Sequence, residues 1–234
     1  LALQDLVSMG VSNIITFDAH DPRVQNAIPL HGFDNIRPSY QMLKALVRAY
    51  PDISLSKDDL MFISPDEGAM SRSMYYSSVM GVELGMFYKR RNYSIIIDGK
   101  NPIEAHEYLG KSVEGKDVIV VDDMISSGDS ILDVSEQLKE KGARRVFLFT
   151  TFGLFVSGPE VFDKAYEKGI FNKVFTTNLI YTSPEITSRE WYESVNMCKY
   201  VASIIDTLNH NQSMSSLLDP VTRIHKIMDK QAAK

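Results

Sequence analysis

The sequence contains a single cysteine, Cys198, so it cannot form an intramolecular disulfide. A lone cysteine fits a protein of a reducing compartment such as the cytoplasm, and the helical pattern around Cys198 predicts a buried, unreactive thiol. No apolar run approaches the roughly 18 to 20 residues needed to span a bilayer. Basic residues are also scarce, because 25 Lys and Arg face 30 Asp and Glu, for a net charge of −5. The expected partners are therefore small molecules or other protein chains, with no nucleic acid and no membrane.

The first ten residues, LALQDLVSMG, lack both an initiator Met and the basic and long apolar regions of a signal peptide. We expect them to be the broken end of a longer chain. What the sequence does have is 44% hydrophobic and 24% charged residues, which is the ordinary globular range. A chain of 234 residues with this composition can bury one ample core.

Strand-like and helix-like segments alternate along the chain. Short runs of β-branched and aromatic residues predict strands at Asn13–Phe17, Leu60–Ser64, Glu83–Tyr88, Asp117–Val121, Arg145–Thr151 and Lys173–Asn178. Amphipathic segments predict helices at Ser39–Tyr50, Gly68–Val82, Ser130–Lys141, Gly158–Lys168 and Thr187–Leu208. This alternation predicts an α/β fold, a largely parallel sheet flanked by helices, with ligands at the carboxyl ends of its strands. The segment from Asn209 onward is expected to be a less ordered extension.

The stretch VIVVDDMISSGDS carries the most informative chemistry. Asp122 and Asp123 follow a buried strand, where we expect them to emerge at the strand's end and accept hydrogen bonds from a vicinal diol such as that of a ribose. The loop from Ser126 to Ser130 precedes a helix, whose N-terminal N–H groups and dipole favour a phosphate. In the alternative interpretation, Ser127 or Asp129 only caps the helix and both aspartates are solvated. The residues alone do not decide between the two.

Several motifs together resemble a known family. VVDDMISSGDS is similar to the phosphoribosyl-binding loop of the type I phosphoribosyltransferase fold. Four further stretches narrow the resemblance to ribose-phosphate pyrophosphokinase, also called phosphoribosyl pyrophosphate synthetase: IITFDAHDPRVQNAIP, FISPDEGAMSR, GMFYKRR and QSMSSLLDP. They occur in the family's order from about Asn13 to Pro220. The resemblance therefore covers nearly the whole chain and implies a phosphoribosyltransferase-like fold.

The resemblance implies a set of site residues. Ribose 5-phosphate would bind Asp122, Asp123, Ser126, Ser127, Gly128, Asp129 and Ser130, and pyrophosphate would bind Asp66, Glu67, Gly68 and Ala69. His20 and Asp66 would help to hold Mg²⁺, which accompanies ATP. Lys89 and Arg91 would be the catalytic cations of a loop that closes over the phosphates. The implied reaction transfers the β,γ-diphosphoryl group of ATP to ribose 5-phosphate and releases AMP.

The sequence departs from the family pattern at a few of these positions. Ser126 stands where the family usually has Asp, and Asp129 stands where it usually has Gly. Glu67 and Ala69 also depart from the usual small-residue pattern of the pyrophosphate segment. Two alternatives therefore stay open: a phosphoribosyltransferase that shares only the Asp122 loop, and a non-catalytic regulatory subunit associated with the synthetase.

The family is built from two similar domains, which implies a division of this chain. Residues 1–35 would be a remnant of the amino-terminal domain, 36–208 the phosphoribosyltransferase-like domain, and 209–234 a carboxy-terminal tail. We expect the remnant to contribute one strand with an exposed edge, which favours self-association into a homo-oligomer.

Overall fold

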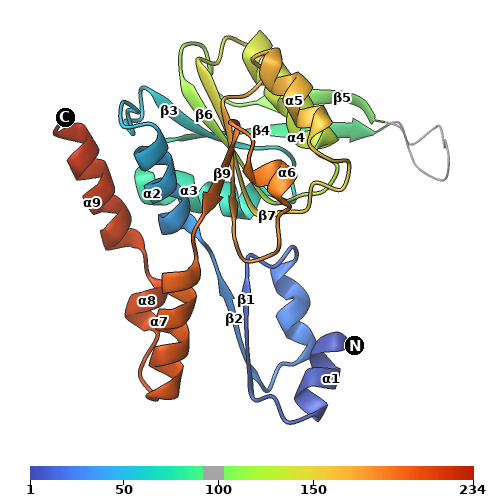
Figure 1. Ribbon diagram of the computed structural model, residues 1–234, viewed down its shortest axis with the longest axis vertical. Helices are drawn as coiled ribbons and strands as arrows, with labels where there is room; N and C mark the ends of the chain where they lie inside the picture. The colour runs from blue at the N-terminus through green and yellow to red at the C-terminus, as the bar shows by residue number, and fades with distance from the viewer. Residues whose placement is uncertain (92–102) are drawn as a thin grey trace.

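The computed structural model describes residues 1–91 and 103–234, with side chains described up to Tyr88 and from Glu107 onward. Its centre is a seven-stranded sheet in the order β5-β4-β3-β6-β7-β8-β9 (Figure 1). The strands are β3 (Leu60–Ser64), β4 (Glu83–Arg91), β5 (Ile103–Leu109), β6 (Asp117–Ile125), β7 (Arg145–Gly153), β8 (Lys173–Thr177) and β9 (Tyr192–Val195). Only the pairing of β4 with β5 is antiparallel within this sheet. The largely parallel arrangement is the one that the alternating sequence pattern predicts.

Helices cover both faces of this sheet. One face packs against α2 (Ser39–Ala49), α3 (Met70–Met80), α7 (Cys198–Asn209) and α9 (Val221–Ala232). The other face packs against α4 (Asp129–Glu140), α5 (Glu160–Glu167) and α6 (Pro184–Thr187). Strand β6 shows why both faces are apolar: Ile119 and Val121 lie in one core cluster, whereas Val118 and Val120 lie in the other. Alternate side chains of a strand point to opposite faces, so a central strand of such a sheet is apolar throughout.

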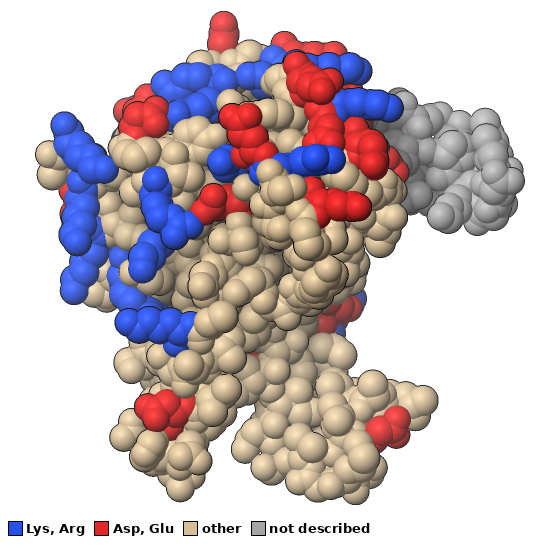
Figure 2. Space-filling view, viewed as in Figure 1, with Lys and Arg blue, Asp and Glu red and all other residues tan. Residues whose placement is uncertain are grey.

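Residues 1–36 form a smaller sheet of their own, below the main one in Figure 1. It pairs β1 (Asn13–Phe17) in parallel with β2 (Gly32–Ile36), and it is flanked by α1 (Ala2–Ser8) and a 3-10 helix, η1 (Pro22–Ala27). Figure 2 shows few charged side chains over this lower part of the molecule. The sequence predicted only the first strand, because the GFDNI segment of β2 lacks a clear apolar alternation.

Three local predictions were wrong. The single helix expected from Thr187 to Leu208 is wrong: α6 ends at Thr187, strand β9 follows, and helix α7 begins only at Cys198. Cys198, the first residue of α7, is exposed rather than buried. The extension after Asn209 contains α8 (Ser215–Leu218) and α9, and Ile224 of α9 is buried in the core.

Three hydrogen bonds also fix α9 to the rest of the protein. The Gln231 side-chain amide donates to the carbonyl oxygens of Pro51 and Ile53 at 2.7 and 2.9 Å, and His225 Nε2 lies 2.9 Å from the carbonyl oxygen of Val79. These contacts connect α9 to the segment that follows α2 and to α3. Among the described residues, no helix combines the length and the hydropathy needed to cross a membrane.

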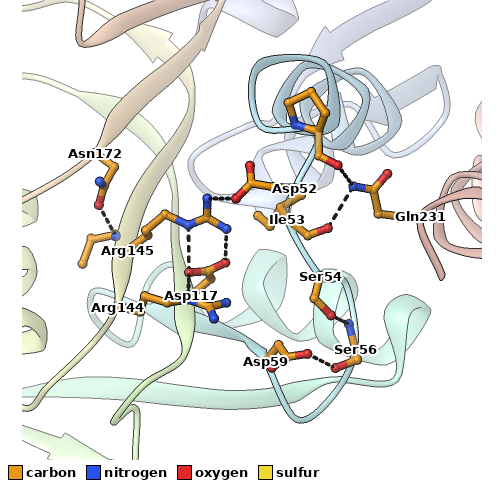
Figure 3. A network of polar contacts seen from close by, with 12 residues as sticks. Asp52, Ile53, Ser54, Ser56, Asp59, Asp117, Arg144, Arg145, Asn172 and Gln231 are labelled. Carbon is orange, nitrogen blue, oxygen red and sulfur yellow. Dashed lines mark hydrogen bonds and ion pairs between the residues drawn. The ribbon is translucent and has the colours of Figure 1, made fainter. Parts of the chain in front are cut away.

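A buried carboxylate, Asp117 at the start of β6, binds two arginines at the start of β7 (Figure 3). Asp117 is fully buried, and it accepts hydrogen bonds from Arg144 Nε at 2.8 Å and from Arg145 Nε and Nη2 at 3.0 and 2.6 Å. Arg145 also donates to Asp52 at 2.7 Å. Burial by itself raises the pKa of Asp117, but the hydrogen bonds and charges of Arg145 and Arg144 outweigh it and lower the pKa.

Replacing Asp117 by Asn is expected to lower the free energy of unfolding by about 2 kcal/mol at pH 7, since hydrogen bonds to charged groups are lost. The folded carboxyl group has a lower pKa than the unfolded one. Its stabilisation is therefore complete above the unfolded pKa, about 4, and is lost as the pH falls through the folded pKa. Urea unfolding at pH 7 and pH 3 should show the difference between wild type and variant shrinking at the lower pH. The exposed Asp58→Asn serves as control, and a difference independent of pH would contradict the assignment.

Candidate functional site

The predicted site residues lie at the carboxyl ends of parallel strands. Residues 18–20 follow β1, residues 65–69 follow β3, and residues 126–130 follow β6. Asp122 and Asp123 lie within β6 rather than after it, because the strand continues to Ile125 and pairs with β7 up to that residue. The prediction that both carboxylates emerge at the strand's end was therefore wrong by a few residues. They still face the segments that follow the neighbouring strands.

The two carboxylates have different surroundings. The side chain of Asp123 is 3% exposed, and its Oδ2 lies 2.8 Å from Nδ1 of His20, whose own side chain is 76% exposed. Asp122 is more accessible, at 23%, and its Oδ1 accepts a hydrogen bond from the Asp123 N–H at 2.9 Å. Asp123 therefore orients His20, and Asp122 offers the more accessible oxygens to a ligand.

A buried arginine, Arg72 of α3, lies among three carboxylates. Its side chain is 7% exposed, and its Nε donates to Asp18 Oδ1 at 3.2 Å. Its Nη1 lies 3.7 Å from Asp122 Oδ1 and 3.8 Å from Asp123 Oδ1, and donates to the Gly68 carbonyl oxygen at 3.4 Å. One guanidinium group thus connects the residues that follow β1, the residues that follow β3, and strand β6.

Asp18 holds the other end of this connection. Its Oδ2 accepts a hydrogen bond from Thr151 Oγ1 of β7 at 2.8 Å, and its side chain is buried. Its backbone φ is +43°, a left-handed conformation that Asp adopts more readily than most residues and that turns the chain from β1 toward His20. Reasoning from the sequence missed both Asp18 and Arg72. Several carboxylates predicted at one sheet edge need a neighbouring cation, but the sequence does not indicate which basic residue supplies it.

Burial and local contacts raise the pKa values of Asp122 and His20 and lower the pKa of Asp123. Burial, followed by the hydrogen bond with Asp123, raises the pKa of Asp122. Burial also acts to raise the pKa of Asp123, but hydrogen bonds with Asp122 and His20 and the charge of Arg72 lower it. The hydrogen bond and charge of Asp123 raise the pKa of His20. The two aspartates therefore titrate as a pair whose negative charge rests mainly on Asp123.

The loop from Ser126 to Ser130 turns sharply at Gly128, where φ is +95°. The carbonyl oxygens of Ile125 and Ser126 accept hydrogen bonds from the N–H groups of Leu154 and Val156. Within the described part of the chain, the N–H groups of Ser127, Gly128 and Asp129 donate to no protein acceptor. Helix α4 begins directly after, so the loop presents N–H donors at the N-terminus of a helix.

The side chains of this loop do not cap α4. The N-cap residue is Gly128, and no side-chain hydrogen bond caps the helix, so the alternative in which Ser127 or Asp129 only caps it was wrong. Instead, Ser127 Oγ donates to Asp129 Oδ2 at 2.9 Å. This hydrogen bond engages the carboxylate that departs from the family pattern, although its negative charge remains in the first turn of the helix.

Replacing Gly128 by Ala is expected to destabilise the fold by about 2 kcal/mol, from left-handed backbone strain and steric overlap. A Cβ at Gly128 would overlap the Phe162 ring, which is fully buried. Gly115→Ala is the matched control, because Gly115 also has a positive φ, +71°, but no atom within 4 Å of the added carbon. Thermal unfolding should show the larger loss for Gly128→Ala. Equal losses would show that Phe162 does not restrict this loop.

Hydrogen bonds within the predicted pyrophosphate segment and with the end of β3 hold its conformation. Helix α3 begins at Met70 rather than at Gly68, which corrects the predicted helix start. The Ala69 N–H donates to Asp66 Oδ1 at 3.2 Å, and Ser64 Oγ donates to the Asp66 carbonyl oxygen at 2.7 Å. Glu67 and Gly68 are exposed. The carboxylate of Glu67 therefore does not fill the interior of this turn.

Lys89 and Arg91 lie on β4, whose backbone continues beyond the end of its parallel neighbour β3. In the pairing with β5, Lys89 is opposite His106 and Arg91 is opposite Ile103. Their side chains lie outside the described residues, so their role as catalytic cations stays a prediction. The role of His20 and Asp66 as metal ligands also stays a prediction. The described side chains include no cluster of three or more His, Cys, Asp or Glu that could hold an ion alone.

Comparison with known structures first defines the class of fold. The crystal structure of phosphoribosylpyrophosphate synthetase from Mycobacterium smegmatis superposes with a TM-score of 0.71 and 21% identity, over 90% of this chain and 63% of that one. The predicted fold class, an α/β fold with a largely parallel sheet, is therefore confirmed. The family follows from the sequence: a model described as the phosphoribosyl synthetase-associated domain matches residues 94–219, more than half of the chain. The chain belongs to this family.

Curated relatives carry a consistent name. The ribose-phosphate pyrophosphokinase of Ureaplasma parvum is 28% identical over 226 residues, covering 96% of this chain and 64% of the relative. That of Vibrio cholerae is 26% identical over 215 residues, covering 92% of this chain and 63% of the relative. The chain thus spans just under two thirds of the length of these relatives. The resemblance that the motifs indicated is confirmed along nearly the whole sequence.

Proposed function

We propose that this protein acts as a ribose-phosphate diphosphokinase, which transfers the β,γ-diphosphoryl group of ATP to the anomeric hydroxyl of ribose 5-phosphate. The products are phosphoribosyl pyrophosphate and AMP. The observation that carries the proposal is the convergence at Arg72: this side chain contacts Asp18, Gly68 and the Asp122–Asp123 pair, which belong to three of the family's motifs. Motifs far apart in the sequence are thereby held at one edge of the sheet.

The geometry supports distinct roles for the parts of this site. The loop from Ser126 to Ser130 binds the phosphate of ribose 5-phosphate through N–H groups that have no protein acceptor at Ser127, Gly128 and Asp129. Asp122, the more accessible aspartate, accepts hydrogen bonds from the ribose diol. Asp123 holds His20 by its Nδ1 atom. Positive charge from Lys89 and Arg91 then stabilises the diphosphoryl group during transfer.

The residues present fit a Mg²⁺ ion that keeps water and phosphate oxygens as most of its ligands. Asp66 supplies carboxylate oxygen, and the His20 ring is largely exposed and oriented through Nδ1 by Asp123, which leaves Nε2 for the ion. Bound Mg²⁺ would neutralise charge on the transferred phosphates. The assignment of His20 and Asp66 rests on the family resemblance together with this donor chemistry.

The direct test supplies ribose 5-phosphate, ATP and Mg²⁺ to the purified full-length protein and measures AMP release by chromatography. We expect stoichiometric AMP and phosphoribosyl pyrophosphate. Calorimetric titration with ribose 5-phosphate provides a parallel measurement of binding. Binding without AMP release would overturn the catalytic proposal and favour a regulatory subunit.

We also propose that the protein acts in the cytoplasm and that copies of it associate with one another. The exposed free thiol of Cys198 fits a reducing compartment.

In the described part of the chain, β1 and β2 pair only with each other, so each has an unpaired edge. Leu1, Leu30 and Met9 expose apolar surface in the same region. Sedimentation velocity should give a mass above that of one chain, and a monomer at every concentration would refute association.

A further inference from the structure

A cavity of about 510 Å³ lies at the carboxyl end of the edge strand β9. Its walls come from α2, α7, α8 and α9, and none of its lining residues belongs to the candidate functional site. Figure 1 shows α2 between β9 and α9. In parallel α/β sheets the carboxyl ends of the strands are where ligands bind, and a volume of this size accommodates a small organic molecule.

The cavity is lined by basic residues and by no acidic one: Lys44 and Arg48 come from α2, Lys199 from α7, and Arg223 from α9. This is unusual for a chain with a net charge of −5. Figure 2 shows Lys and Arg side chains gathered over α2 and α9 on this face of the molecule. The local potential is therefore positive, which attracts an anionic ligand.

Two of these cations already have partners and two do not. Arg48 forms an ion pair with Glu193. Arg223 lies over the Tyr40 ring, 5.1 Å from its centroid, and donates to the Leu217 carbonyl oxygen at 2.8 Å. Lys44 and Lys199 form no ion pair or hydrogen bond through their ammonium groups with any described residue. Their charges are available to a ligand from opposite walls.

The floor of the cavity consists of buried residues. Tyr200 is nine-tenths buried, and its hydroxyl donates to the Leu217 carbonyl oxygen at 3.1 Å. Val195 and Ala45 beside it are buried in the core. Asn196, just before α7, adds an amide N–H donor, and Ser203 adds a hydroxyl acceptor, since its proton is donated to the Lys199 carbonyl oxygen. A preformed floor with charged walls lowers the entropy lost when a ligand is fixed.

We propose that this cavity binds a small organic polyanion that carries at least two anionic groups. One group pairs with Lys44 of α2, and a second pairs with Lys199 of α7. Phosphate and carboxylate share the required chemistry, since both accept charge-assisted hydrogen bonds from ammonium groups. Such a ligand bridges α2 and α7 beside the carboxyl end of β9. This place is separate from the residues assigned to catalysis.

The test is calorimetric titration of the full-length protein with two probes, a hexose bisphosphate and citrate, at low and high salt. Binding of either probe is expected to weaken with salt, and the tighter probe identifies the anionic group. Replacing Lys44 and Lys199 together by Ser should weaken binding by at least tenfold, because both charge-assisted hydrogen bonds to the anionic groups are lost. Binding of ribose 5-phosphate should stay unchanged in this variant.

Lys226→Ser with Lys230→Ser is the matched control, since it removes the same charge from α9 without changing the lining of the cavity. Asp122→Asn is the second control, because it should weaken ribose 5-phosphate binding and leave probe binding intact. Equal weakening in the two lysine double variants would reduce the effect to net charge and overturn the site. Absence of probe binding by the wild-type protein would also overturn it, whatever the outcome for AMP release.

Discussion

Replacing Arg72 by Ala is expected to lower the free energy of unfolding by about 3–5 kcal/mol, the range for removing one partner of a buried ion pair. The variant leaves Asp18 and Asp123, which are 7% and 2% exposed, without their cation. Thr151 and His20 would still contact these carboxylates, but they cannot replace the charge. Such a loss is a large part of the usual total stability of a domain.

Chemical denaturation of wild type and variant measures this change directly. Arg72→Lys should recover part of the stability, because it restores the charge without the planar group that reaches several acceptors. Arg23→Ala is the surface control: Arg23 contacts only Asp21 among the described residues and its side chain is 81% exposed, so almost no change in stability is expected. Similar losses for Arg72→Ala and Arg23→Ala would show that Arg72 is not structurally important.

The largest expected effect on activity is that of Lys89→Ala. Turnover should fall by about 10²- to 10³-fold, as for removal of one group that stabilises transition-state charge. Affinity for ribose 5-phosphate should be nearly unchanged, because such a group acts mainly on the diphosphoryl group in flight. Steady-state AMP release and calorimetric binding separate the two quantities.

Lys168→Ala provides the control for this variant, because Lys168 is an exposed lysine at the end of α5. It should keep both turnover and binding. If Lys89→Ala retains wild-type turnover, Lys89 has no part in the reaction and the positive charge must come from elsewhere. A parallel loss of ribose 5-phosphate binding would instead assign Lys89 to the substrate phosphate.

The strands of the main sheet could be predicted well because most are buried on both faces. Such strands are continuous apolar runs, as in LMFIS of β3, and every residue of β3 is buried. The carboxylates of β6 were predicted near their true place for the same reason, since Asp122 directly follows the apolar run. The error for these two carboxylates lies in the length of β6. Asp122 and Asp123 look like the end of a strand, yet they continue its pairing with β7.

Edge elements were harder to predict. Strand β9 has four residues and lies beside apolar positions at helical spacing, so sequence periodicity merges it with α7. Helix α9 carries few apolar residues, and only Ile224 is fully buried. Its position depends on contacts with α2 and α3, which are distant in the sequence. Tertiary packing of this kind leaves little trace in a local pattern.

The connection through Arg72 could not be predicted for a similar reason. Arg72 occurs in a helix that also contains several polar residues, and nothing in its spacing separates it from Arg37 or Arg48 on the surface. Arg72 is buried because the segments that follow β1 and β3 meet strand β6 around it, and only the fold brings these parts together. The chemistry of the aspartates was visible in the sequence, but their counter-charge was not.

The packing of α9 has a consequence for biosynthesis. Helices α2 and α3 leave the ribosome long before α9 does, and domains generally fold as units while the chain is made. Until α9 emerges, the surface that receives Ile224 remains open, and the backbone carbonyl oxygens of Pro51, Ile53 and Val79 lack their partners. The nascent chain therefore presents this partly apolar surface until α9 docks on it.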